Sequence, residues 1–419
     1  MAIYSIKNIS FLLISLIIFQ NTDAQEKTDH WLWKKLYNNS SPFLKYILSH
    51  PDTFQYQLIY TRIDRNKKNI PRFKNYYLHT DRNRYFNPAS MVKMPLAFLS
   101  MQKINELNVN GVNIHTTMFT DSSYEGQSSV TKDSLASDGL PSLAQYIKKI
   151  FLISDNDAYN RLYEFVGQET INKRLWQMGY SDIRITRRFV HMTEDQNRHT
   201  NQVRFLNNGA TLYVQPPAYN IQPFDFSKKI LIGKGHLDWQ DHLINEPMDF
   251  TTHNCVPLED LQKILQSVLF PASVSDRKRF NLKNEDMQFL YRYMSEYPRE
   301  SHFPFYDTTE YYDSYTKFFF FRAGKSSIPP YIRSFNKAGW SYGFLTDVAY
   351  IVDLRNNIEF MLSGVIYVNS DGILNDDKYE YEETGYPFFK EVGNIIYQYE
   401  LKRHRKYRPD LEKFKIVYE

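Results

Sequence analysis

Cysteine is almost absent from this chain, because Cys255 is the only one among its 419 residues. No disulfide can therefore form within the chain, and its stability must come from packing rather than from cross-links. A solitary cysteine is more often a small buried apolar residue than a nucleophile. We assign Cys255 no role.

Motifs for metals, phosphates and nucleic acids are also missing. The 11 histidines include no His-x-His and no His-Glu-x-x-His spacing, and no Gly-rich phosphate loop is evident. A formal net charge of +4, from 51 basic and 47 acidic side chains spread along the chain, is too weak for a nucleic-acid-binding surface. We therefore expect no metal, no other cofactor and no nucleic-acid partner.

Long hydrophobic runs are confined to the start of the sequence. Lys7 precedes an apolar run over residues 9–19, and Thr22-Asp23-Ala24 has small residues at the two positions that a signal peptidase reads. The run is too short to cross a bilayer comfortably, and no cysteine follows it for lipid attachment. We predict a signal peptide over residues 1–24, a mature chain starting near Gln25, export to the periplasm or the medium, and no integral membrane span.

The chain does contain many apolar residues, and they recur at the spacings of strands and helices. Its hydrophobic content is 42% and its aromatic content is 16%, which suits a globular enzyme-sized core. Alternation of apolar and polar residues predicts a hairpin over residues 53–64 and 75–80. Apolar residues at helical spacing predict helical segments over residues 142–153 and 157–179, with Gly167 and Gly179 as stops.

The second half of the chain is predicted to contain further helices and then three consecutive strands before a last helix. Helices are predicted over residues 258–269, 284–295 and 387–401, and strands over residues 332–336, 341–354 and 358–368.

This order predicts an α/β (α+β) fold within a single domain over residues 25–419. An antiparallel sheet built from both chain ends, about 50–85 and 330–401, is flanked by helices. A helical subdomain is inserted at about 90–200, an insertion-rich region follows at about 201–330, and a cleft is expected where sheet and helices meet.

Serine catalysis needs a base for the hydroxyl and an oxyanion pocket, and Ser-x-x-Lys is one way to supply the base. The pattern alone is weak, because it occurs six times, at Ser90, Ser100, Ser129, Ser275, Ser314 and Ser334.

Context separates Ser90 from the other five serines. Asn87-Pro88-Ala89 precedes it, and apolar residues at helical spacing follow, so Ser90 is expected to open a buried helix beside free N–H groups. Lys93 would share its helix face, and burial could lower the pKa of this lysine. The alternative is a helix-capping serine with a solvated lysine neighbour.

Two further motifs follow in order: Ser154-Asp155-Asn156 at a junction of two helices, and Lys337-Ala338-Gly339 at the start of a strand. Together with Ser90-Met91-Val92-Lys93, they resemble the Ser-x-x-Lys, Ser-Asp-Asn, Lys-Thr-Gly signature of class A β-lactamases and related penicillin-binding proteins. The three motifs span most of the mature chain. The resemblance implies a β-lactamase/transpeptidase-like, DD-peptidase fold.

The resemblance also implies the role of each motif residue. Ser90 would be the acylated nucleophile, Lys93 its base, and Ser154 the relay of a proton to the leaving nitrogen. Asn156, Lys337, Gly339 and Trp340 would form the substrate-binding set: Asn156 holds substrate and Lys93, Lys337 attracts the substrate carboxylate, and the N–H groups of Ser90 and Trp340 make the oxyanion hole.

Two positions depart from the family pattern. Ala338 stands where Thr or Ser is usual, which removes a hydroxyl that would bind the substrate carboxylate. After Thr186-Arg187-Arg188, which resembles the start of the family's deacylation loop, the spacing of Glu194 to Asn197 is not the family's. Glu194 is the candidate base for the deacylating water, and a surface carboxylate is the alternative.

The resemblance predicts a secreted active-site serine hydrolase, acylated at Ser90 by β-lactams and hydrolysing their amide bond. One alternative is a penicillin-binding DD-peptidase or transpeptidase that acts on D-Ala-D-Ala peptides of peptidoglycan. Another is a non-catalytic binding or sensor protein on the same fold. A β-lactam or a D-Ala-D-Ala peptide is thus the expected partner, and the oligomeric state is left open.

Overall fold

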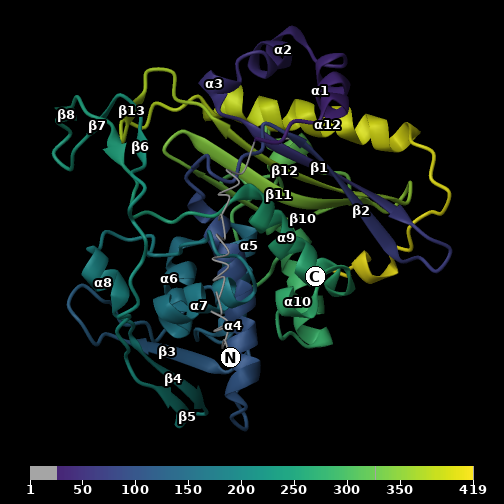
Figure 1. The fold of residues 1–419 in the computed structure, drawn as a ribbon. Helices are drawn as coiled ribbons and strands as arrows, with labels where there is room; N and C mark the ends of the chain where they lie inside the picture. Colours follow the sequence, from purple (N-terminus) through teal and green to yellow (C-terminus); the bar gives the residue numbers. More distant parts are fainter. Residues whose placement is uncertain (1–25, 326, 419) are drawn as a thin grey trace, which may run out of the picture.

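A five-stranded antiparallel sheet organises the protein, in the order β10-β11-β12-β1-β2 (Figure 1). The computed structural model describes residues 26–325 and 327–418, so the predicted signal peptide lies outside the described residues. The strands are β1 (Gln57–Arg65), β2 (Pro71–Leu78), β10 (Ile332–Ser341), β11 (Phe344–Asp353) and β12 (Ile358–Tyr367). The predicted sheet from both chain ends is confirmed.

The two chain ends join where β1 pairs with β12, from Gln57 opposite Val365 to Arg62 opposite Phe360. Strands β11 and β12 are buried along their whole length, because helices cover both faces of the sheet. One face carries α1 (His30–Tyr37), α2 (Pro42–Leu48), α3 (Pro51–Phe54) and α12 (Tyr386–Lys402), and the other carries α9 (Leu258–Leu269) and α10 (Asn284–Ser295) (Figure 1).

The helical subdomain lies beside the second of these faces. It contains α4 (Lys93–Leu107), α5 (Leu143–Leu152), α6 (Asn156–Val166), α7 (Gln168–Gln177) and α8 (Glu194–Arg198). Helix α4 packs against α5 and α6. The helical segment predicted over residues 157–179, with a stop at Gly167, is two helices, because Gly167 adopts a φ of 87° between them, a conformation that breaks the helix.

Small sheets that the sequence did not predict complete the fold. Strands β3 (Thr117–Asp121), β4 (Gln202–Asn207) and β5 (Ala210–Gln215) form one sheet beside α7. Two further small sheets comprise β6 (Leu231–Ile232), β7 (Gly235–Leu237), β8 (Leu243–Ile244), β9 (Met248–Asp249) and β13 (Ile373–Leu374). The latter surround a satellite core of Ile230, Phe250 and Leu374.

Several predicted strand boundaries are wrong, and among them β2 begins at Pro71 rather than at residue 75, and β11 begins at Phe344 rather than at Ser341. Residues 53 and 54 belong to the helical turn α3, and the first strand begins at Gln57, because Pro51 starts a helical turn well. Strand β10 continues to Ser341, so Lys337-Ala338-Gly339 lies within the strand rather than at its start. Pairing with β11 over the full length, from Ile332 to Ser341, explains the longer strand.

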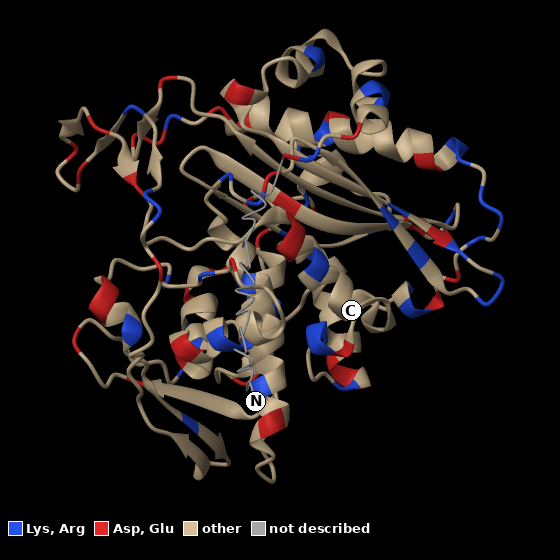
Figure 2. Ribbon diagram, viewed as in Figure 1, with Lys and Arg blue, Asp and Glu red and all other residues tan. Residues whose placement is uncertain are grey.

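Charged residues of both signs are interspersed along the chain (Figure 2). Among the residues that the structure describes, no helix has the length and apolar character needed to cross a membrane.

Candidate active site

Ser90 lies in a short 3-10 turn, Ala89–Val92, directly before α4. The turn is fixed by two hydrogen bonds: the Ala89 N–H donates to Asn87 Oδ1 at 2.8 Å, and the Met91 N–H donates to the Pro88 carbonyl at 2.9 Å. The helix expected to open at Ser90 therefore begins at Lys93. Ser90 does not cap it: among the described residues, the half-buried Ser90 hydroxyl has no hydrogen-bond partner. The hydroxyl is free to attack a substrate.

Lys93 is fully buried at the start of α4, so it is not a solvated neighbour of Ser90. Its Nζ donates to the Ser154 carbonyl and, at 2.6 Å, to Asn156 Oδ1. Burial, reinforced by the charge of Lys337, holds the pKa of Lys93 well below its usual range. A neutral lysine amine has two protons, and these two acceptors satisfy both. Its lone pair is then available as a base.

Ser154 occupies the junction between α5 and α6 with a φ of 64°. Its neighbour Asp155 caps α6 by accepting a hydrogen bond from the Ala158 N–H at 2.8 Å. This cap turns Ser154 toward both lysines of the site. The Ser154 hydroxyl lies 3.4 Å from Lys93 Nζ and accepts a hydrogen bond from Lys337 Nζ at 2.9 Å.

Strand β10 supplies Lys337, which is 1% exposed. Burial lowers the pKa of Lys337 to about 7; Asp347 opposes this shift, and Lys317 adds to it. Successive residues of a strand face opposite sides, so Ala338 points away from Lys337. Ala338 is completely buried in the hydrophobic cluster on the α12 side of the sheet. The departure from the family motif thus falls at a core position.

Gly339 brings β10 into contact with the turn that holds Ser90. A Cβ atom at this position would lie 2.8 Å from Ser90 N and 3.1 Å from the Pro88 carbonyl oxygen. Only glycine allows this approach without a shift of one backbone or the other. The next residue, Trp340, is held by its ring, whose centroid lies 5.7 Å from that of Tyr315 and 5.9 Å from that of Phe318.

The candidate deacylation base does not join this cluster. Glu194 is solvent-exposed in the first turn of α8 and makes no hydrogen bond or ion pair with the described residues. The Phe189 ring lies over Lys93 instead, with its centroid 4.7 Å from Nζ. The Phe189 N–H donates to Asn160 Oδ1 at 2.9 Å, which fixes the loop. The role of Glu194 stays a prediction of the sequence.

A buried polar network behind β10 was also missed by sequence reasoning. Lys317 Nζ donates to Asn336 Oδ1 at 2.7 Å, and Asn336 Nδ2 donates to Asp347 Oδ1 at 2.8 Å. Asp347 Oδ2 accepts from the Phe318 N–H at 3.1 Å. The network therefore joins the segment around Phe318 to the strand that carries Lys337 and Gly339. Its only sequence signal was a set of polar residues in an apolar strand region.

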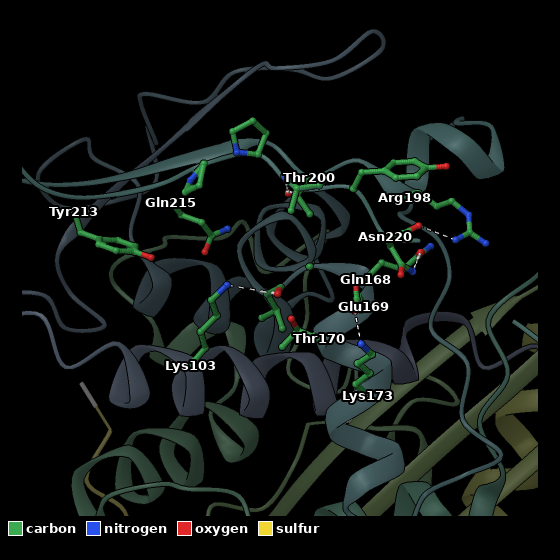
Figure 3. A pocket seen from close by; sticks show the side chains of 16 residues that line it. Lys103, Gln168, Glu169, Thr170, Lys173, Arg198, Thr200, Tyr213, Gln215 and Asn220 are labelled. Atoms are coloured by element: carbon green, nitrogen blue, oxygen red, sulfur yellow. Dashed lines mark hydrogen bonds and ion pairs between the residues drawn. The ribbon is translucent and has the colours of Figure 1, made fainter. Parts of the chain in front are cut away.

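A separate cavity of about 400 Å³ lies between the start of α7 and the chain after β5 (Figure 3). Lys103, Lys173 and Arg198 are among its lining residues, and Lys103 Nζ donates to the Phe165 carbonyl. None of the predicted site residues lines this cavity. It is distinct from the cluster around Ser90.

Comparison with known proteins finds a match in sequence. Residues 69–210 match the family model described as the β-lactamase enzyme family. This span holds Ser90, Lys93, Ser154 and Asn156, whereas Lys337 lies beyond it. No curated protein matches the chain.

Solved structures align over most of the chain at low identity. The β-lactamase of Sphaerobacter thermophilus is 13% identical, covers 88% of this chain and 97% of its own, and has a TM-score of 0.47. TLA-1 extended-spectrum β-lactamase is 14% identical, covers 88% of this chain and 100% of its own, and has a TM-score of 0.48. PBP-A, solved as an acyl-enzyme complex with penicillin G, is 12% identical, covers 89% of this chain and 97% of its own, and has a TM-score of 0.46.

Proposed function

We propose that this chain, a β-lactamase-like protein by its match over residues 69–210, is a secreted serine hydrolase that β-lactams acylate at Ser90. One observation carries the proposal: Lys93, Ser154 and Lys337 form a connected polar cluster from three separate elements, α4, the α5–α6 junction and β10. Next to this cluster, Gly339 contacts the Ser90 turn. The arrangement supplies a base, a proton relay and an adjacent nucleophile.

Acylation would use these groups in sequence. The lone pair of neutral Lys93 takes the proton from Ser90 Oγ as this oxygen bonds to the lactam carbonyl carbon. The N–H groups of Ser90 and Trp340 stabilise the resulting oxyanion. The carbon–nitrogen bond then breaks, and the Ser154 hydroxyl donates a proton to the leaving nitrogen while Lys337 Nζ reprotonates Ser154 across their 2.9 Å hydrogen bond.

Deacylation requires a second base for the attacking water. Phe189 covers Lys93 with an apolar ring, and Glu194 makes no contact with the cluster among the described residues. We therefore propose that deacylation is slower than acylation and that the acyl-enzyme accumulates. The same observation favours a second candidate, a penicillin-binding peptidase acting on D-Ala-D-Ala peptides, in which a lactam acylates the serine and is released slowly.

Mass spectrometry of the intact protein after incubation with benzylpenicillin tests acylation. Ring opening loses no atoms, so the expected adduct has the full mass of the penicillin. Ser90→Ala should abolish it. The matched control is Ser100→Ala, which alters another Ser-x-x-Lys serine, buried on α4 and bonded to the Leu96 carbonyl. This variant should still form the adduct.

A chromogenic cephalosporin distinguishes the candidates. Continuous colour development that depends on Ser90 indicates a β-lactamase, and a single stoichiometric burst indicates the peptidase. If the folded protein forms no adduct and hydrolyses no lactam, the proposal is overturned. A binding or sensor function is then the remaining hypothesis.

A further inference from the structure

Beyond the end of β10, three segments far apart in the sequence meet. The backbones of Arg184 and Cys255 exchange two hydrogen bonds of 2.8 Å. The Asn254 Oδ1 atom accepts from the Thr186 N–H at 2.7 Å and from the Arg187 N–H at 3.2 Å. The loop that leads to Phe189 is thereby fixed to a segment of the insertion-rich region.

Aromatic rings connect this junction to two chain segments that lead to the proposed catalytic groups. The Phe250 ring centroid lies 4.6 Å from that of His253, 5.1 Å from that of Tyr342 and 5.9 Å from that of Tyr85. Tyr85 is in the segment that leads into the Ser90 turn, and Tyr342 follows Trp340 by two residues. The junction is therefore a continuation of the candidate active site.

Three polar groups at this junction have no partner. The Arg187 guanidinium, the His253 ring nitrogens and the Tyr342 hydroxyl make no hydrogen bond or ion pair with any described residue, and all three side chains are only partly exposed. Glu194 lines a small recess together with Arg187 but forms no ion pair with it. A partly buried arginine without a carboxylate partner is unusual, because its desolvation is left uncompensated.

The charge of Arg187 acts on the other two groups. Burial lowers the pKa of His253 to about 3, and Arg187 adds to this shift. His253 is therefore neutral at physiological pH, with one ring nitrogen able to donate a hydrogen bond. Burial raises the pKa of Tyr342, while Arg187 opposes that rise, so Tyr342 keeps its hydroxyl proton as a donor. The junction offers one cation and two neutral donors.

The position of the junction indicates which part of a substrate would reach it. Lys337 and Ser154 mark the end of the site where the leaving nitrogen is protonated. Tyr342 lies five residues further along the chain, in the turn that follows β10, and the strand from Lys337 to its end at Ser341 spans about 13 Å. Ser90 is contacted by Gly339, between these two ends. With its leaving nitrogen at Ser154, as the proposed function requires, a substrate bound across Ser90 would extend its acyl side chain toward Tyr342 and Arg187.

We propose that Arg187, His253 and Tyr342 bind a carboxylate on the acyl side chain of the substrate. This inference rests on the proposed function, acylation of Ser90. A guanidinium can hold a carboxylate through two parallel hydrogen bonds, and the imidazole and phenol can donate to the remaining lone pairs. The preferred substrates are then lactams or peptides with an acidic group on the acyl side.

Two penicillins that differ by one group test the proposal: benzylpenicillin and its α-carboxy analogue. The readout is the ratio of their acylation rates, measured by intact mass at matched concentrations. The unmodified protein should favour the α-carboxy compound, and Arg187→Gln should lower the ratio about tenfold or more, as expected for the loss of a charge-assisted pair. Arg187→Lys keeps the charge without the planar fork and should retain part of the ratio.

Arg204→Gln is the matched control, because Arg204 is a partly buried arginine on β4 whose guanidinium donates to Asp121, outside the recess that Arg187 lines. Its ratio should equal that of the unmodified protein. An unchanged ratio in Arg187→Gln, or a fall as large in Arg204→Gln, would overturn the carboxylate site while leaving acylation intact. Absence of acylation by either penicillin in the unmodified protein would instead overturn the proposed function.

Discussion

Substitution of Gly339 by alanine tests the contact between β10 and the Ser90 turn. The new Cβ atom would lie 2.8 Å from Ser90 N, whereas ordinary contacts begin at 3.4 Å, so the two backbones must separate by about 0.6 Å. The three nearest atoms all belong to the backbone, which cannot rotate away as a side chain would. Gly339 lies in a regular strand, so the effect is one of space and not of strained φ.

The separation moves the Ser90 N–H and the Trp340 N–H relative to each other. Loss of one oxyanion donor costs about a hundredfold to a thousandfold in rate, and a misplacement of about 1 Å costs about a hundredfold. For a shift of about 0.6 Å, we expect Gly339→Ala to acylate ten- to a hundredfold more slowly. Overpacking should also lower the free energy of unfolding by about 1 to 3 kcal/mol.

Acylation by benzylpenicillin, followed by intact mass over time, measures the rate, and circular dichroism checks folding. Gly364→Ala is the control: its Cβ atom would meet side chains of Leu58 and Phe389 at 2.9 and 3.1 Å on the α12 side of the sheet. It should lose stability without slowing acylation. A folded Gly339→Ala protein that acylates at the unmodified rate would refute the role given to this contact.

Three further outcomes are expected. The acylation rate should fall above pH 7, approaching tenfold per pH unit, because Lys337, whose pKa burial lowers to about 7, loses the proton that it donates to Ser154; a flat profile between pH 6 and 9 would contradict this. Phe189→Ala should admit water to Lys93, raise its lowered pKa and shift the acidic limb of the same profile to higher pH, a change absent if the ring does not shield the amine. Asp347→Ala removes the acceptor of Asn336 and of the Phe318 N–H, and should lower the free energy of unfolding by about 2 to 4 kcal/mol in urea denaturation.

The sequence predicted the elements whose signals are local. Helices α9 and α10 have the predicted bounds, because strong apolar periodicity and flanking turns define them. The sheet from both chain ends was predicted from strand patterns near each end. The break between α6 and α7 was also predicted, because Gly167 was recognised as a helix stop, and its φ of 87° between the two helices confirms that role.

The candidate site was predicted as a set of residues, but its geometry was not. The motifs identified Ser90, Lys93, Ser154 and Lys337, and the structure brings the last three together. The cover that Phe189 forms over Lys93 depends on how a loop folds back across about a hundred residues of sequence. No periodicity or motif encodes such a contact.

The pairing of β1 with β12 has a consequence for how the protein folds during synthesis. Gln57 and Val365 are partners across about 300 intervening residues, and a loop of that length must close before the sheet is complete. Long-range pairings of this kind slow folding. During synthesis the Ser90 turn emerges long before Lys337 and Gly339, so the nascent chain carries an unfinished site. The proposed reaction at Ser90 would become possible only after the last quarter of the polypeptide has been synthesised and β10 has packed against the Ser90 turn.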